Sequence, residues 1–257
     1  MSSIYSDTDI SKVYKDFLPE LKSYLYRLTC DKEIANDLAQ DTFIKVIEKQ
    51  NQFKGQSSLK TWIFSIATNL ALDWLRKRKR WSETAQDDSK ALAQSGPTYR
   101  TTFLDISENS STGVFDFKEH ISFCFTCISK TLVIEQQVTL ILKDIYDFKV
   151  SEISIILSSP AGTVKHWLFS ARQTMAEIFD RRCALVNKEG VCYQCSELNG
   201  LFNPKQKKLE NVFPIADKKD LYRLRAKLVK AISPLSSNGS ELEDTLMQVL
   251  RKAINDK

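Results

Sequence analysis

The fold of this chain is decided by residues 25–80, which read LYRLTCDKEIANDLAQDTFIKVIEKQNQFKGQSSLKTWIFSIATNLALDWLRKRKR. Apolar side chains recur there every three or four positions, which is the spacing of one face of an α-helix. Asp31 has the residue type of a helix N-cap, and the turn segment 51–58 ends in Ser57 and Ser58, either of which can cap the next helix. The stretch therefore predicts one helix after Asp31 and another over residues 59–80.

The same helical spacing continues on both sides of this stretch. Apolar residues mark a helix that begins near residue 11, and the pattern returns over residues 120–179 and in the tail after residue 203. Pro160 suits the first turn of a helix with Ser159 as its cap, and a helix, a short turn and a second helix form a helix-turn-helix. The chain has only 7 Gly and 6 Pro, which disfavours a turn-rich β fold. We therefore expect an all-α protein.

Length and charge restrict the class of protein further. A chain of 257 residues favours two modest domains, and a net charge of +5 permits a polyanionic partner without requiring one. Two histidines exclude a histidine-rich metal site. The longest uncharged runs have 12 residues, whereas a membrane span needs about 20 apolar residues. Because the N-terminus also lacks a signal-peptide pattern, we expect no membrane insertion and a cytoplasmic location, where thiols are kept reduced.

The composition changes along the chain and indicates four segments. Residues 82–119 carry seven acidic and three basic side chains among Ser, Thr and Gly residues, which is typical of a linker. We therefore predict a helical bundle over residues 10–81, an acidic linker over 82–119, a helix-turn-helix domain over 120–182 and a cysteine-containing helical extension over 183–257.

The sequence contains no recognisable catalytic motif. It lacks a Gly-rich phosphate loop, a His-Glu-x-x-His zinc helix and a Gly-x-Ser-x-Gly nucleophile turn, so we expect no enzymatic activity. Asp37 and Asp41 lie one turn apart on a predicted helix, and they suit an acidic binding face better than a catalytic pair. The five consecutive bases of 76–80 either hold a nucleic-acid backbone or form a solvated helix end.

Residues 25–80 resemble the second conserved region of bacterial sigma-70 factors, and more narrowly that of the extracytoplasmic-function group. The matching motifs are Asp37-Leu38-x-Gln40-Asp41-x-Phe43, Phe53-x-Gly55-x-Ser57-Ser58-Leu59-x-Thr61-Trp62 and Asn69-x-Ala71-Leu72-Asp73-x-x-Arg76. Residues 142–172 are similar to the fourth region of the same family. The motifs there are Ser151-Glu152-Ile153, Gly162-Thr163-Val164-Lys165 and Leu168-x-x-Ala171-Arg172. Together the two stretches cover about half of the chain.

The resemblance implies a sigma factor that binds core RNA polymerase and directs promoter-specific initiation, with no cofactor required and an anti-sigma factor as a further expected partner. The residues implied in core-polymerase binding are Asp37, Leu38, Gln40, Asp41 and Phe43. Those implied in binding the −10 element are Phe53, Ser57, Ser58, Thr61, Trp62, Asn69, Asp73, Arg76, Lys77, Arg78, Lys79 and Arg80. Those implied in binding the −35 element are Thr163, Lys165, His166, Ser170 and Arg172.

Two departures from the family pattern concern the helix-turn-helix. Ser158 and Ser159 stand where the turn usually carries Gly and an apolar residue, and Trp167 and Phe169 stand where basic or polar residues are usual. An alternative function is that of a stand-alone helix-turn-helix regulator, which would not need residues 25–80. A thiol oxidoreductase ranks below both, because no βαβ pattern surrounds either Cys-x-x-Cys pair.

Five cysteines bracket the predicted helix-turn-helix domain, and two interpretations of them stay open. Cys124 and Cys127 precede the domain, and Cys183, Cys192 and Cys195 follow it. Thiolates at Cys-x-x-Cys spacing suit Zn or another soft metal, and they equally suit a redox switch. Core packing explains Cys124 and Cys127 as well, since positions i and i+3 share one face of a helix. Some sigma factors of this group carry cysteine-rich C-terminal segments that sense metals, which this arrangement resembles.

Overall fold

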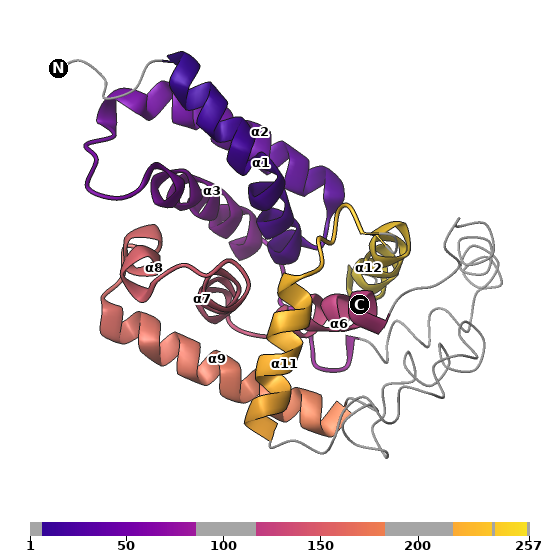
Figure 1. The fold of residues 1–257 in the computed structure, drawn as a ribbon. Helices are drawn as coiled ribbons and strands as arrows, with labels where there is room; N and C mark the ends of the chain where they lie inside the picture. The colour runs from indigo at the N-terminus through magenta and orange to yellow at the C-terminus, as the bar shows by residue number, and fades with distance from the viewer. Residues whose placement is uncertain (1–6, 86–116, 183–217, 238–239, 256–257) are drawn as a thin grey trace. The chain divides into compact units, whose positions relative to one another are not determined.

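The computed structural model describes residues 7–85, 117–182, 218–237 and 240–255, and within these ranges it contains helices and no strand (Figure 1). The all-α prediction is therefore confirmed. The chain divides into two compact units, the first formed by residues 1–79 and 133–171 and the second by residues 80–132 and 172–257. The four domain boundaries drawn from the sequence stay predictions. No helix in the described part of the chain has both the length and the hydropathy of a membrane span.

The N-terminal part of the first unit consists of three helices and a short 3₁₀ turn. They are α1 (Asp7–Thr29), α2 (Lys32–Lys49), η1 (Gln50–Gln52) and α3 (Leu59–Arg76). Asp31 caps α2, because its Oδ1 accepts the backbone N–H groups of Glu33 at 3.0 Å and Ile34 at 3.1 Å. Ser58, and not Ser57, caps α3, because its Oγ accepts the Thr61 N–H at 3.0 Å. Both helix starts thus follow from short polar side chains that satisfy N–H groups at the helix N-terminus.

Helix α3 ends at Arg76, four residues before the predicted end at Arg80. The Arg78 side chain explains the early end. Its guanidinium lies 3.6 Å from the centre of the Trp74 ring and donates to the Trp74 carbonyl oxygen at 3.0 Å. The Arg78 backbone N–H donates instead to the Leu75 carbonyl at 3.1 Å, so the α-helical hydrogen-bond pattern does not continue there.

The rest of the first unit contains the predicted helix-turn-helix. Its helices are α7 (Ile134–Asp144), α8 (Val150–Ile156) and the first part of α9 (Ala161–Arg182). Helix α9 begins one residue after Pro160, whereas the sequence predicted Pro160 in its first turn. The Ser159 hydroxyl donates to the Leu157 carbonyl at 3.0 Å, so it faces back toward α8.

Aromatic side chains form the centre of the first unit. Tyr24 of α1 lies 5.3 Å from Phe64 of α3, measured between ring centres, and Tyr146 and Phe148 of the turn after α7 approach the same pair. The Tyr24 hydroxyl also shares a 2.8 Å hydrogen bond with Thr68. Burial raises the pKa of both Tyr24 and Tyr146 above the ordinary tyrosine value, so both stay protonated at neutral pH.

The second unit is built around α6 (Phe117–Ser129), which contacts α11 (Lys218–Lys230) and α12 (Ser240–Asn255). The Phe125 ring of α6 lies 6.3 Å from Tyr222 of α11 and 6.4 Å from Phe179 of α9. Arg225 stacks on Phe179, with 4.3 Å between the guanidinium carbon and the ring centre. The two predicted tail helices are therefore present, and α11 packs on the helix that carries Cys124 and Cys127.

The turn between α8 and α9 contains a strained residue that generates a prediction. Ser158 has a φ of 48°, in the left-handed region that favours glycine. The free energy of unfolding of the Ser158→Gly variant should therefore be about 0.5–1 kcal/mol higher than that of wild type, because glycine has no side chain to oppose this conformation. Urea denaturation followed by circular dichroism measures the difference. Ser159→Gly is the matched control and should be destabilised, since Ser159 has no positive φ. Equal effects of the two variants on the free energy of unfolding would contradict the strain assigned to Ser158.

Candidate nucleic-acid interface

The exposed side of α2 carries the predicted acidic face. Asp37, Gln40 and Asp41 are exposed to solvent. Leu38 points inward with 7% of its surface exposed, and the Phe43 ring lies 4.9 Å from the Tyr14 ring of α1. Of the five residues predicted to bind core polymerase, three are exposed, Leu38 is buried and Phe43 packs on α1.

An apolar residue extends this acidic face and was missed by the sequence analysis. Ile44 is 53% exposed and lies one helical turn beyond Gln40 and Asp41. The signal was available, since Ile44 follows Asp37, Gln40 and Asp41 at helical spacing. Ile44 therefore adds one apolar side chain to the exposed side of α2 that carries the carboxylates.

The loop before α3 and the first turns of α3 bring together several predicted −10 residues. The Phe53 ring lies 5.2 Å from the Trp62 ring, and Phe53 is buried while Trp62 is half-buried. Ser58 caps the helix and shares a 2.8 Å hydrogen bond with the Thr61 hydroxyl. Thr61 itself is fully buried. Asn69 and Asp73 are exposed further along α3, so the predicted set has exposed, half-buried and fully buried members.

The five bases of 76–80 differ in what their side chains contact. Arg76 faces the carboxylates of Asp73 and Glu135, each at 3.8 Å, and Arg78 is held against Trp74. Arg80 donates to the carbonyl of Ser129 at 3.3 Å within the second unit. Among the described residues, the side chains of Lys77 and Lys79 are exposed and form no ion pair or hydrogen bond, so they are the members most available to phosphates.

The first turns of α9 present a polar face with one aromatic side chain. Lys165, His166 and Arg172 are exposed, while Thr163 and Ser170 are half-buried. The opposite side of the helix is buried through Val164, Leu168 and Ala171. Phe169 is 68% exposed, and it lies at helical spacing from His166 and Arg172.

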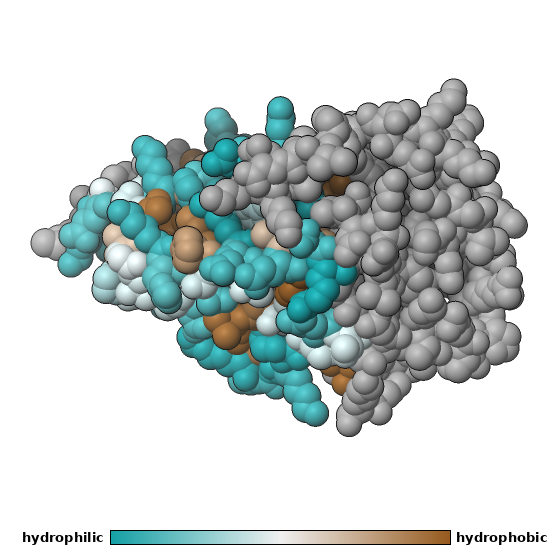
Figure 2. Space-filling model, turned by 90° about the horizontal axis from the view of Figure 1, so that it is seen from below, coloured by the Kyte–Doolittle hydropathy of each residue, from teal (hydrophilic) through white to brown (hydrophobic). Residues whose placement is uncertain are grey.

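Hydrophobic residues are scattered over the visible described surface. Figure 2 shows that hydrophilic residues cover most of it and that the hydrophobic residues form separate patches. The large exposed apolar side chains of the described chain are Ile44, Val133, Ile155 and Phe169. Single exposed apolar residues of this kind are ordinary on a protein surface.

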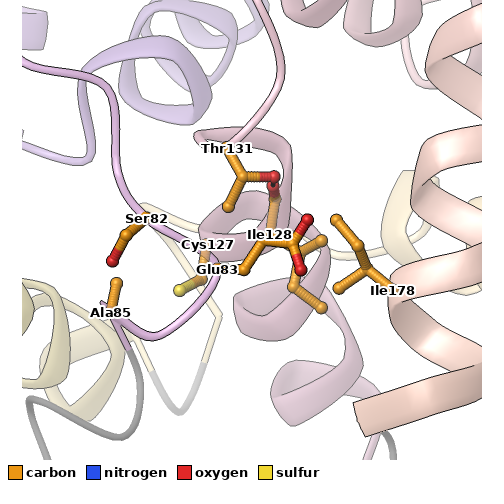
Figure 3. A pocket seen from close by; sticks show the side chains of 7 residues that line it. All are labelled: Ser82, Glu83, Ala85, Cys127, Ile128, Thr131 and Ile178. Carbon is orange, nitrogen blue, oxygen red and sulfur yellow. Dashed lines mark hydrogen bonds between the residues drawn. The ribbon is translucent and has the colours of Figure 1, made fainter.

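The described cysteines lie in the interior of the protein. Cys124 is 8% and Cys127 is 2% exposed on α6, and neither forms a disulfide within the described part of the chain. Cys127 lines a hollow with Ser82, Ala85 and Ile178, which Figure 3 shows together with the remaining lining residues. The hollow has a volume of about 10 Å³, which is room for one water molecule and too little for a small-molecule substrate.

The metal interpretation stays a prediction. Within the described ranges, no group of three or more His, Cys, Asp or Glu side chains is arranged to hold a metal ion. Cys183, Cys192 and Cys195 lie outside the described residues. Cys30 follows the end of α1 with a φ of 56°, and its N–H donates to the Tyr26 carbonyl at 2.7 Å, so it serves as the C-terminal turn of that helix.

Comparisons with known proteins identify the family. The sequence model described as Sigma-70 region 2 matches residues 13–81. The RNA polymerase sigma factor YlaC of Bacillus subtilis (strain 168) is 28% identical over 163 residues, which are 63% of this chain and 87% of YlaC. The ECF RNA polymerase sigma factor SigW of the same strain is 29% identical over 171 residues, which are 65% of this chain and 85% of SigW. Residues 13–81 thus match Sigma-70 region 2, and over 63–65% of its length the chain is similar to sigma factors, SigW among them of the ECF type.

A solved structure of a sigma factor is similar to part of this chain. The sigma factor RpoE from Bartonella quintana, in complex with the anti-sigma factor NepR, is 25% identical with a TM-score of 0.47, and the match covers 67% of this chain and 97% of RpoE. The Sigma-70 region 2 match takes in α2, α3 and most of α1. Every residue that the sequence assigned to core-polymerase and −10 binding lies inside that match.

The unequal contacts of the basic run generate a prediction about salt dependence. Replacing an exposed lysine that contacts a phosphate reduces the number of released counterions by one. For the holoenzyme on promoter DNA, Lys77→Ala and Lys79→Ala should each lower the slope of log affinity against log salt by about 0.7–0.9. Filter binding at several KCl concentrations measures the slope.

The matched controls for this prediction are Arg78→Ala and Lys15→Ala. The Arg78 guanidinium is engaged by Trp74, so its removal should change the slope less than removal of Lys77. Lys15 is exposed on α1, outside the predicted interface, and its removal should leave the slope unchanged. Equal slopes for Lys77→Ala and wild type would show that this lysine contacts no phosphate.

Proposed function

We propose that this sigma factor directs promoter-specific initiation by presenting three surfaces of one chain to core RNA polymerase and to promoter DNA. The surfaces are the acidic face of α2, the Phe53–Arg80 segment and the polar face of α9. The observation that supports the proposal most is the Sigma-70 region 2 match over residues 13–81, because those residues include the exposed carboxylates of α2 and the free lysines after α3. The chain itself carries out no chemical step, and the polymerase supplies catalysis in the cytoplasm.

The acidic face of α2 is the proposed contact with core polymerase. Asp37 and Asp41 lie four residues apart, so their carboxylates project from one side of the helix. Charge complementarity speeds association and fixes the register of an interface, and the partner surface is therefore expected to be basic. Leu38 and Phe43 pack inward and keep the carboxylates in place.

The segment around α3 is the proposed reader of the −10 element as single-stranded DNA. An unstacked base can stack on an aromatic side chain, and the half-buried Trp62, which packs on the buried Phe53, offers such a surface at the start of α3. Removing a base from the duplex stack costs a few kcal/mol, which pocket contacts offset. Asn69 and Asp73 are exposed on the same helix, and Lys77 and Lys79 follow it as phosphate contacts.

The first turns of α9 are the proposed reader of the −35 element as duplex DNA. A recognition helix contacts base edges and phosphates from its exposed side, and Lys165, His166 and Arg172 occupy that side here. Thr163 and Ser170 are half-buried hydroxyls that can add hydrogen bonds to phosphates. An anti-sigma factor, expected from the family resemblance, stays a prediction.

Reversing one charge on α2 tests the core-polymerase contact. Asp41→Arg should weaken binding to core polymerase at least tenfold, because a cation would face a basic partner surface. Asp16→Arg is the matched control, since Asp16 is exposed on α1 and makes the same charge change away from the face. Fluorescence anisotropy of labelled sigma factor with core enzyme measures affinity, and run-off transcription from genomic fragments measures initiation.

The same experiment separates the two candidate functions. If the Asp41→Arg variant regulates transcription as wild type does, and core enzyme does not change its binding to DNA, a stand-alone helix-turn-helix regulator would be favoured. Failure of wild-type protein to direct initiation on any genomic fragment would contradict the proposed function altogether.

We also propose that the cysteines of the C-terminal extension bind a soft metal ion. Binding or loss of this ion would then change promoter activity. Cys124 and Cys127 supply two thiols on one face of α6, which is an incomplete ligand set, so a full site needs Cys183, Cys192 or Cys195 as well. Zinc prefers four such ligands, and a bound ion would join segments on both sides of the helix-turn-helix.

Metal analysis of protein purified without chelator tests this proposal. We expect one equivalent of zinc per wild-type chain and its loss in the Cys192→Ser/Cys195→Ser variant. The Cys30→Ser variant is the control, since Cys30 belongs to the end of α1, and it should keep its metal. If all three proteins have the same metal content, thiol oxidation state and promoter activity, the proposal that the cysteines regulate this protein is contradicted.

A further inference from the structure

Helix α11 has one side that packs on the second unit and one side that faces solvent. On the packed side Tyr222 is 7% and Val229 is 0% exposed, and α11 contacts α6 within this unit (Figure 1). Arg225 lies on the packed side as well, because its guanidinium stacks on Phe179 of α9 with 4.3 Å to the ring centre. These buried positions recur at helical spacing, so they fix which side of α11 is displayed to solvent.

The displayed side of α11 carries a row of basic side chains. Arg223, Lys227 and Lys230 are exposed, and they follow one another at spacings of four and three residues. Residues at these spacings are neighbours on one side of a helix. The 13 residues of α11 include six basic residues and one acidic residue. The three exposed members, here called the basic row, therefore make this side of the helix strongly positive.

Helix stability does not account for the basic row. Like charges three or four residues apart on a helix repel each other and destabilise it. The helix dipole favours cations in the last turn, which covers Lys227 and Lys230, but Arg223 lies seven residues before the end of α11. Asp220 is the one acidic residue of the helix, and it precedes Lys227 by seven residues. An anionic partner would offset the repulsion that the row retains.

The position of α11 favours duplex DNA as this partner. Helix α9 is continuous over Ala161–Arg182, and the Phe179 ring on which α11 stacks follows Arg172, a proposed −35 contact, by seven residues. Arg172, Phe179 and α11 belong to the same compact unit. Seven residues of helix are about 10 Å long, which is about the rise of three base pairs. The helix is therefore anchored close to DNA that a −35 contact would hold.

The spacing of the basic row also suits a DNA backbone. The seven residues from Arg223 to Lys230 span about 10 Å along α11, and the phosphates of one strand follow one another every ~3.4 Å along the duplex axis. Long, flexible basic side chains at this spacing can contact two or three phosphates of one strand. Such contacts position a protein on DNA without reading its sequence.

We propose that the basic row of α11 binds the phosphate backbone of the duplex DNA that flanks the −35 element. The inference rests on the proposed function, because it takes α9 as the helix that reads this element. The row adds a fourth binding surface, and this surface contributes affinity without sequence preference. The C-terminal extension thereby takes part in promoter binding itself.

A double variant of the row, studied in the full chain, tests the contact. Lys227→Gln/Lys230→Gln removes two of its charges, and Lys12→Gln/Lys15→Gln is the matched control, because these two exposed lysines have the same three-residue spacing on α1. Filter binding of each holoenzyme to promoter DNA at several KCl concentrations gives the slope of log affinity against log salt. The row variant should lower this slope by about 1.8, or about 0.9 for each lost phosphate contact. Its affinity at physiological salt should fall at least fivefold, and the control should match wild type.

Hydroxyl-radical footprinting of the promoter backbone locates the contact. Wild-type holoenzyme should protect backbone positions directly beside the −35 element, and these should become at least threefold more reactive with the row variant. Protection of the −35 element itself should stay unchanged. An unchanged slope together with an unchanged footprint would overturn the proposal. Weaker binding of the row variant to core polymerase with an unchanged DNA slope would overturn it in favour of an acidic protein surface.

Protein stability provides a check on the role of the row. Because the row variant relieves like-charge repulsion, its free energy of unfolding should equal or exceed that of wild type. Arg225→Gln should have a lower free energy of unfolding, since it removes the stack on Phe179. Urea denaturation followed by circular dichroism measures both. A destabilised row variant would show that the row supports the fold and would contradict the argument from repulsion.

A measurement that needs neither promoter nor polymerase separates this proposal from the proposed function. The free chain is bound to a duplex of unrelated sequence at several KCl concentrations, and the row variant should again have a slope about 1.8 lower than wild type. This difference, together with wild-type protein that directs no initiation, would contradict the proposed function alone. Normal initiation, together with equal slopes on both DNAs, would contradict the α11 contact alone.

Discussion

The packing of Tyr24, Phe64 and Tyr146 is the interaction on which the first unit depends. Each ring comes from a different part of the chain, so the cluster joins α1, α3 and the turn after α7 at one point. A buried aromatic side chain stabilises a protein by about 3–5 kcal/mol relative to alanine, which is a large share of the total stability of a domain. The hydrogen bond between Tyr24 and Thr68 and the one from Tyr146 to Ser23 satisfy the two hydroxyls that this packing buries.

The positions of the charged side chains also depend on how the helices pack. Its net charge of +5 is the sum of segments with opposite character, since the carboxylates of α2 and the lysines after α3 lie on different elements. Helix α2 presents Asp37 and Asp41 to solvent, while Leu38 is buried and the half-buried Phe43 packs on Tyr14 of α1. Burial of apolar side chains thus decides where the charged groups are displayed.

Local signals were sufficient for most of the helices. Asp31 caps α2 and Ser58 caps α3, as is usual for a short polar side chain that precedes a segment with helical apolar spacing. The two tail helices lie where the leucine spacing predicts them. The errors lie at helix ends, where a single side chain changes the outcome. Arg78 returns to the Trp74 carbonyl just after α3 ends, and Ser158 adopts a left-handed φ in the turn before α9. Neither event is visible in a periodicity pattern, because each depends on one rotamer or one backbone angle.

The sequence by itself determined the helical fold, the family and the residue types of the three proposed binding surfaces, since these depend on spacing and on short-range chemistry. The tertiary structure alone decided which of those residues are available. It buries Thr61 against Glu152, turns Arg78 back onto Trp74, leaves Lys77 and Lys79 exposed and places Ile44 beside the acidic face. The physical reason is that exposure is set by contacts between segments far apart in the chain, and such contacts leave no periodic trace in the sequence of either segment.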